Sequence, residues 1–152
     1  MDFSGEKAAT VDEKGRVVLP AEFKQEMGGR VPDSQLVVEE DPYVKCLNIY
    51  PLEIWNKHIS TILEKLNPNN RNHSRLLDMI YKRFKKVAVP DSCRIHIPGI
   101  FAEKMNIGKE VMFVGRGDRI RLWGREEYEK YLTETDSGYG DLYEELLGPT
   151  DQ

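Results

Sequence analysis

The chain has 152 residues, of which 39% are hydrophobic and 32% are charged, and its formal net charge is −4. This composition is that of an ordinary soluble protein of one domain or two small ones, and no apolar run approaches the roughly 18 residues of a membrane span. The N-terminal segment lacks the apolar stretch of a signal peptide, and the two cysteines lack metal-ligand spacing. We therefore expect a cytoplasmic protein with no membrane segment, no metal and no cofactor.

The first predicted elements come from residues 11–29, which read VDEKGRVVLPAEFKQEMGG. The β-branched run that ends at a proline predicts a short strand. Phe23 and Met27 are four residues apart and are followed by glycine, which predicts one or two helical turns with both side chains on one face.

Two further strands are predicted over residues 35–41 and 45–51, with a turn at the Asp-Pro dipeptide between them. Residues 71–86 predict a basic helix, with six basic residues and one acidic residue. Such a run is typical of a solvated helix face, and it also permits an anionic partner. Helical spacing of apolar residues predicts a helix before the basic one, with an apolar stripe of Leu52, Trp55, Ile59, Ile62 and Leu66. In the basic helix the apolar stripe is formed by Leu76, Leu77, Ile80 and Phe84.

Charge is unevenly distributed along the chain. Residues 136–152 contain five acidic residues and no Lys or Arg, so the rest of the chain has 22 basic and 21 acidic residues, a net charge of +1. The negative total therefore does not exclude a nucleic-acid partner for the remaining surface. Residues 141–147 have apolar residues at helical spacing, but we expect this tail to be a poorly ordered terminus.

The second half of the chain repeats the first. Six positions match at an offset of 73: Ile49 and Leu122, Tyr50 and Trp123, Glu53 and Glu126, Trp55 and Tyr128, Lys57 and Lys130, and Ile59 and Leu132. Four earlier positions match at an offset of 78: Arg16 and Arg94, Pro20 and Pro98, Phe23 and Phe101, and Met27 and Met105. Agreement of residue type, order and spacing over two blocks indicates a duplication.

One copy of about 45 residues is marginal for burying a core alone, so we expect the two copies to pack their sheets together. The predicted fold is α+β, a pseudo-twofold, β-barrel-like domain made of two β-α-β-β-type repeats with flanking helices. The predicted divisions are a first repeat over residues 4–66, a bridging basic helix over 67–86, a second repeat over 87–132 and an acidic tail over 133–152.

The segment DEKGR, residues 12–16, has the composition of a tight turn. Gly15 supplies a position with positive φ, and Asp12 can accept hydrogen bonds from backbone N–H groups two or three residues later. Lys14 lies at the tip, and Arg16 leaves the turn at the start of a strand. Such a turn often carries only a solvated arginine. The alternative is an arginine held by a rigid strand end and directed at phosphates or a guanine edge, which the recurrence of Arg94 favours.

The second copy departs from this pattern at two positions. Arg94 is kept, but Pro90 and Cys93 stand where the first copy has aspartate and glycine, which leaves the shape of the second turn open. His96 alternates with isoleucines on a predicted strand, so it shares a side of that strand with Arg94.

The duplicated motif and the segment EVMFVGRGDRIRLWGREEYEKYL, residues 110–132, resemble the MraZ family of bacterial transcriptional regulators. That family is built from two SpoVT/AbrB-type repeats of the swapped-hairpin type, and the resemblance covers residues 4–132. It implies that Arg16 and Arg94 contact DNA. We place Lys14 with them, and we assign Asp12 and Gly15 to forming the turn.

The resemblance also implies a partner and an assembly. The expected partner is double-stranded DNA with direct repeats, in the promoter of the division and cell-wall gene cluster, and the expected location is the nucleoid within the cytoplasm. The expected assembly is a ring-like homo-oligomer, in which linked copies multiply a weak contact through their effective concentration. No small-molecule substrate is expected.

Two other classes of function stay open. One is a non-enzymatic, antitoxin-like interaction module of the same fold, with residues 141–147 as its partner-binding segment. The other is an enzyme, which the sequence disfavours because His58, His73 and His96 are scattered without triad or metal spacing. Large aromatics at matching repeat positions predict packing in a core or subunit interface rather than base stacking: Trp55, Trp123, Tyr128 and Tyr131.

Overall fold

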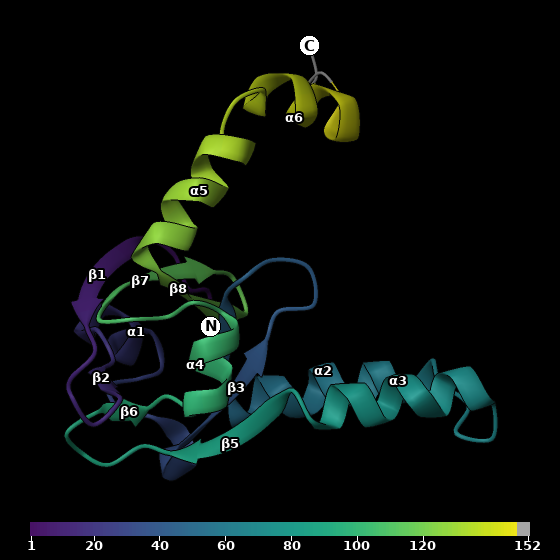
Figure 1. The fold of residues 1–152 in the computed structure, drawn as a ribbon, viewed down its shortest axis with the longest axis horizontal. Coiled ribbons are helices and arrows are strands. Elements are labelled where there is room, and N and C mark those ends of the chain that lie inside the picture. The colour runs from purple at the N-terminus through teal and green to yellow at the C-terminus, as the bar shows by residue number, and fades with distance from the viewer. Residues whose placement is uncertain (149–152) are drawn as a thin grey trace.

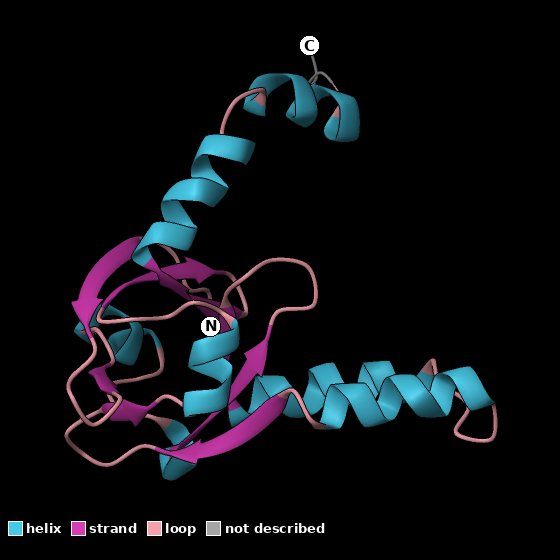
Figure 2. Ribbon diagram, viewed as in Figure 1, coloured by secondary structure: helices cyan, strands magenta, loops and turns pink. Residues whose placement is uncertain are grey.

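Two antiparallel sheets and six α-helices make up the part of the chain that the computed structural model describes, residues 1–148. The mixed α+β class predicted from the sequence is confirmed (Figures 1 and 2). The smaller sheet is a two-stranded ribbon of β2 (Arg16–Val18) and β6 (Arg94–His96). The larger sheet has, in spatial order, β1 (Glu6–Thr10), β7 (Glu110–Arg116), β8 (Arg119–Gly124), β4 (Leu47–Pro51), β3 (Gln35–Glu40) and β5 (Phe84–Ala88).

The larger sheet interleaves strands from the two halves of the chain. β1, which precedes the first arginine motif, pairs with β7, which follows the second. β5, which precedes the second motif, pairs with β3, which follows the first. At the centre, β4 and β8 pair with Ile49 opposite Ile120. The sheet therefore joins two copies that are each marginal for a core alone.

The larger sheet is open, so the barrel-like closure predicted from the repeats is wrong. A closed barrel requires its edge strands to pair with each other. Here β1 and β5 lie at opposite edges of the six-stranded sheet, with four strands between them. The swapped-hairpin, pseudo-twofold arrangement stays a prediction.

The helices either cover the core or extend away from it. Phe23 and Phe101 are buried on two short helices, as their matching repeat positions predict. Figure 1 shows α2 and α3 as a hairpin that projects from the sheet, and α5 and α6 leading away in another direction. Within residues 1–148, every helix is too short or too polar to cross a lipid bilayer. The helices are α1 (Ala21–Glu26), α2 (Leu52–Glu64), α3 (Arg71–Tyr81), α4 (Gly99–Lys104), α5 (Arg125–Thr135) and α6 (Tyr139–Leu147).

Two segments differ from their sequence-based expectations. The sequence predicts one helix over residues 71–86, but α3 ends at Tyr81, and β5 occupies the last residues because its backbone pairs with β3. Phe84 then packs against Trp55, with ring centroids 4.6 Å apart, instead of facing inward from a helix. The sequence also predicts a poorly ordered tail, whereas residues 139–147 form α6. Residues 149–152 of that predicted tail lie outside the described part.

The large aromatics pack inside the protein, as the repeat pattern predicts. Trp55 of α2 is buried against Tyr50 of β4. Trp123 is buried with Tyr128, and the partly buried Tyr131 packs on it with ring centroids 4.7 Å apart. These contacts fix α2 and α5 at equivalent places on the sheet and leave the indole rings inaccessible to bases.

A buried polar cluster lies where β3, β4 and β8 meet. The Asp41 carboxylate accepts hydrogen bonds from the backbone N–H groups of Tyr43 and Val44, from the Asn48 amide and from Arg121. Burial alone raises the pKa of Asp41, but the two backbone hydrogen bonds, the Asn48 bond and the Arg121 charge together hold that pKa below its ordinary value. The ionised carboxylate therefore stabilises the fold.

The Asp41→Asn variant is expected to lose about 1.5–3 kcal/mol of stability at pH 7, because Arg121 then lacks its buried counter-ion. Since the folded-state pKa of Asp41 is lowered, the contribution is complete above the ordinary value of 3.8 and is lost as the pH falls through the folded-state pKa. Urea unfolding of both proteins at pH 7 and near pH 2.5 measures this. The difference in the free energy of unfolding between the two proteins should shrink at the lower pH. An equal difference at both pH values would contradict the assignment.

Candidate nucleic-acid interface

The two arginine motifs fold into equivalent turns despite their different sequences. In the first turn the Gly15 N–H donates to the Asp12 carbonyl at 3.0 Å, and in the second the Cys93 N–H donates to the Pro90 carbonyl at 2.8 Å. Gly15 has φ +79° and Cys93 has φ +59°, so both lie in the left-handed region. The sequence leaves the shape of the second turn open. In the structure this turn has the same form as the first, so Arg94 follows it as Arg16 follows the first turn.

Strands β2 and β6 pair so that both arginines lie on one exposed face of the ribbon. Arg16 lies opposite His96, and Val18 lies opposite Arg94. The two residues between them, Val17 and Ile95, point inward and are buried. The alternation confirms that His96 shares a face with Arg94, as the strand pattern predicts, and the register brings both arginine motifs together.

The turns also brace each other across the ribbon. The Ile97 N–H donates to the Gly15 carbonyl, and the Leu19 N–H donates to the Cys93 carbonyl, both at 2.9 Å. Each turn is thus tied to the strand that leaves the other turn. The ribbon and its two turns form one hydrogen-bonded unit.

A single carboxylate, that of Asp12, organises the whole cluster. Its Oδ1 accepts the backbone N–H groups of Lys14 and Arg16, each at 2.9 Å. Its Oδ2 accepts Arg16 Nε at 3.2 Å and lies 3.6 Å from Arg94 Nη1. The backbone hydrogen bond from Arg16 is the largest influence on Asp12 and, with that from Lys14 and the Arg16 charge, holds the pKa of Asp12 below its ordinary value. The sequence predicts the local turn but not the contact with Arg94.

Both guanidinium groups remain open to solvent. The side chain of Arg16 is 37% exposed and that of Arg94 is 49% exposed, and Lys14 is exposed at the tip of its turn. Asp12 holds Arg16 by Nε alone, and within residues 1–148 neither terminal nitrogen of Arg16 forms a hydrogen bond. Those two nitrogens form the fork that pairs with a phosphate or with the O6 and N7 atoms of guanine.

The Gly15→Ala variant is expected to lose about 1–2 kcal/mol of stability, because alanine is strained at a positive φ. The added Cβ would lie 3.6 Å from His96 Nε2, an ordinary contact, so strain and not collision causes the loss. Thermal unfolding measures it. Gly99→Ala is the matched control because Gly99 lacks a positive φ and has open space around its Cβ. Equal effects at the two positions would argue against strain at the turn.

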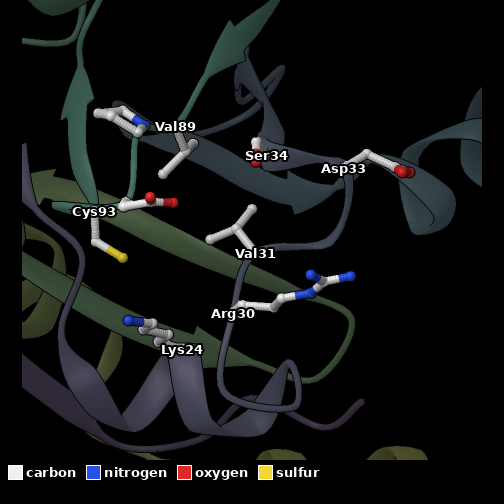
Figure 3. Close-up of a pocket in the computed structure, with 9 residues that line it drawn as sticks. Lys24, Arg30, Val31, Asp33, Ser34, Val89 and Cys93 are labelled. Carbon is white, nitrogen blue, oxygen red and sulfur yellow. The ribbon is translucent and has the colours of Figure 1, made fainter.

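A cavity of about 360 Å³ lies behind the second turn. Figure 3 shows the Cys93 thiol directed into it, with Lys24 and Arg30 on the opposite wall. Asp33 and Asp91 also line it, so the two cations are balanced by two carboxylates. The cavity therefore does not extend the positive face of the ribbon. Within the described residues, no three His, Cys, Asp or Glu side chains are grouped to hold a metal ion.

Comparison with known proteins identifies the family of this chain. The family model described as "MraZ protein, putative antitoxin-like" matches residues 3–78 and 86–139, which include both arginine turns. The chain belongs to the MraZ family. The resemblance found in the duplicated motif is thereby confirmed.

Several MraZ relatives match nearly the whole chain. The transcriptional regulator MraZ of Bacteroides fragilis is 30% identical over 145 residues, which cover 95% of this chain and 90% of that protein. The protein of the same name from Phocaeicola vulgatus is 30% identical over 149 residues, 97% of this chain and 95% of its own length. That of Thermoanaerobacter pseudethanolicus is 30% identical over 142 residues, 93% and 94% of the two chains.

Proposed function

We propose that this chain is a transcriptional regulator that binds double-stranded DNA through the β2–β6 ribbon. The observation that carries the proposal is the shared placement of Arg16 and Arg94 on one exposed face, held by the single carboxylate of Asp12. The major groove of DNA admits a two-stranded β-ribbon, and arginine forks recognise guanine there. The names of the MraZ relatives as transcriptional regulators support the same function. The proposed activity is binding rather than catalysis.

In the proposed interface, each residue has a separate task. Arg16 and Arg94 contact the bases or phosphates, and Lys14 contacts phosphate from the tip of the first turn. Asp12 and Gly15 shape the turn and orient the two guanidinium groups. His96 faces the same side and lies opposite Arg16, which supports a contact of its side chain with the DNA backbone.

The proposed assembly is a ring-like homo-oligomer bound to direct repeats in the promoter of the division and cell-wall gene cluster, in the nucleoid of the cytoplasm. Two arginines per chain give a weak contact, and linking several ribbons raises the effective concentration of each one. The exchange of strands between the two repeats supports a swapped-hairpin unit as the building block.

Fluorescence anisotropy with duplexes tests the proposal. The labelled promoter duplex should bind more tightly than a scrambled duplex of equal length, and its affinity should fall steeply as salt rises, because phosphate contacts release counterions. Equal affinity for both duplexes, or affinity that is insensitive to salt, would contradict the proposed function.

The alternative function is an antitoxin-like protein-interaction module, which the description of the family model favours. It predicts a stable complex with one protein partner and no DNA binding. Purified chain in the same anisotropy assay separates the two functions, because this alternative predicts no change on titration into either duplex.

A further inference from the structure

Helix α6 exposes an apolar face that nothing within residues 1–148 covers. Its five large apolar side chains recur at helical spacing and are between 43% and 74% exposed: Tyr139, Leu142, Tyr143, Leu146 and Leu147. Nine residues are too few for a helix to be stable in water by itself. An apolar stripe on so short a helix is typical of a surface that packs against another surface.

A groove lies elsewhere on the chain, between the α2–α3 hairpin and the turn that follows β3. It encloses about 620 Å³. Its apolar wall includes Leu76 and Met79 of α3, which are 45% and 46% exposed, and Ile62 of α2. Tyr43, at its mouth, is 92% exposed. The groove thus offers unpartnered apolar surface on the scale of one helix face.

The charges of the two surfaces are complementary. Four arginines and the three carboxylates of Glu39, Glu40 and Asp41 line the groove, and two of the arginines are paired, Arg119 with Asp118 and Arg121 with Asp41. Within residues 1–148, Arg83 and Arg116 form no ion pair with a carboxylate, so the groove keeps two unpaired cations. The Arg83 guanidinium is held there by a hydrogen bond from its Nη1 to the Met79 carbonyl, 2.8 Å long. The polar side of α6 carries three carboxylates and no basic residue: Asp141, Glu144 and Glu145. These carboxylates also form no ion pair among the described residues.

We propose that α6 of one copy docks in this groove of a second copy, with its apolar face on α2 and α3 and its carboxylates against Arg83 and Arg116. Within one chain the two surfaces are apart, since Figure 1 shows α6 and the α2–α3 hairpin extending in different directions. This inference rests on the assembly proposed above and names the contact that builds it. Because α6 and the groove are different surfaces, the contact is head-to-tail and adds copies in one direction until a ring closes.

Native mass spectrometry of two variants tests the docking. Leu142→Asp with Leu146→Asp in α6 should reduce the wild-type multimer to single chains, because the apolar face is interrupted by charge. Leu63→Asp is the control, since Leu63 is an exposed leucine of α2 outside the groove, and it should keep the multimer. A monomeric wild type, or an α6 variant that keeps the wild-type mass, would overturn the inference.

Mixing two defective proteins tests the head-to-tail geometry. The α6 variant retains an intact groove, and a groove variant with Leu76→Asp and Met79→Asp retains an intact α6. Each should be monomeric alone, and the mixture should give a one-to-one pair and nothing larger. The failure of the mixture to pair would exclude a head-to-tail contact.

Charge-reversal variants distinguish a lost contact from misfolding. Arg83→Glu with Arg116→Glu should dissociate the multimer, and the further changes Glu144→Arg and Glu145→Arg in the same chain should restore it. Restoration requires a folded protein, so it excludes general damage as the cause. If the combined variant stays monomeric while circular dichroism shows a native fold, the docking is refuted.

The outcomes separate this inference from the proposed function. Arg16→Ala should leave the multimer intact, since Arg16 is on the ribbon and not in the groove. If Arg16→Ala binds DNA like wild type while the mixing experiment gives pairs, the function is wrong and the docking stands. If Arg16→Ala loses DNA binding while the α6 variant keeps its mass, the docking is wrong and the function stands.

Discussion

Arg16→Ala is expected to weaken binding to the promoter duplex by roughly 5- to 150-fold for each ribbon engaged, because a bidentate arginine contact is worth about 1–3 kcal/mol. In the proposed assembly the losses multiply across linked copies, so the protein should lose binding at physiological salt. The fold should be unaffected, since the Arg16 side chain is 37% exposed and its partner Asp12 remains bonded to backbone N–H groups. Anisotropy measures the affinity, and circular dichroism checks the fold.

Arg94→Ala should give a loss of similar size, because the second turn holds its arginine on the same face of the ribbon. Arg125→Ala is the matched control: Arg125 is an exposed arginine of α5 whose partners are Glu110 and Glu129. It changes the net charge equally but should leave affinity nearly unchanged. Equal losses in all three variants would mean that overall charge, and not the ribbon, governs binding.

Ile95→Ala is expected to destabilise the protein by about 2–5 kcal/mol, the usual cost of a large-to-alanine change in a core. Ile95 is fully buried, lies opposite Val17 in the ribbon and packs in the main core. At about 2–4 °C per kcal/mol for a chain of this size, Tm should fall by roughly 4–20 °C. Thermal unfolding at fixed protein concentration measures the change.

The neighbouring His96 gives the matched comparison, since it points to the opposite, exposed face of the same strand. His96→Ala should change stability by no more than about 0.5 kcal/mol, as surface substitutions usually do. A large loss of stability at His96, or a small one at Ile95, would contradict the face assignment of the ribbon.

The sequence predicts the local parts of this fold well because their signals are local. The β-branched runs before Pro20 and Pro98 predict β2 and β6, and the spacing of Phe23 and Met27 predicts the short helix α1. The sequence does not predict β1, because β1 is an edge strand whose exposed side chains show no alternation of apolar and polar residues. The sequence does not predict β5, because its lysines continue the basic run of α3 and only the pairing with β3 shows that it is a strand.

In the candidate site, too, the sequence predicts the local features but not the long-range contacts. The turn formed by Asp12 and Gly15 is local and can be predicted from composition. The contact between Asp12 and Arg94 joins residues 82 positions apart, and it depends on the register of β2 against β6, which no local pattern encodes. The sequence also does not predict the positive φ of Cys93, because cysteine gives no signal for a left-handed conformation.

Photocrosslinking from the exposed face of the ribbon tests the central claim most directly. Val18 lies opposite Arg94 on that face and is 50% exposed, so benzoylphenylalanine placed there should crosslink to the promoter duplex in good yield. The same group at Ser60, an exposed position on α2, should not crosslink. Crosslinks from position 60 with none from position 18 would show that DNA lies on another surface and would contradict the account.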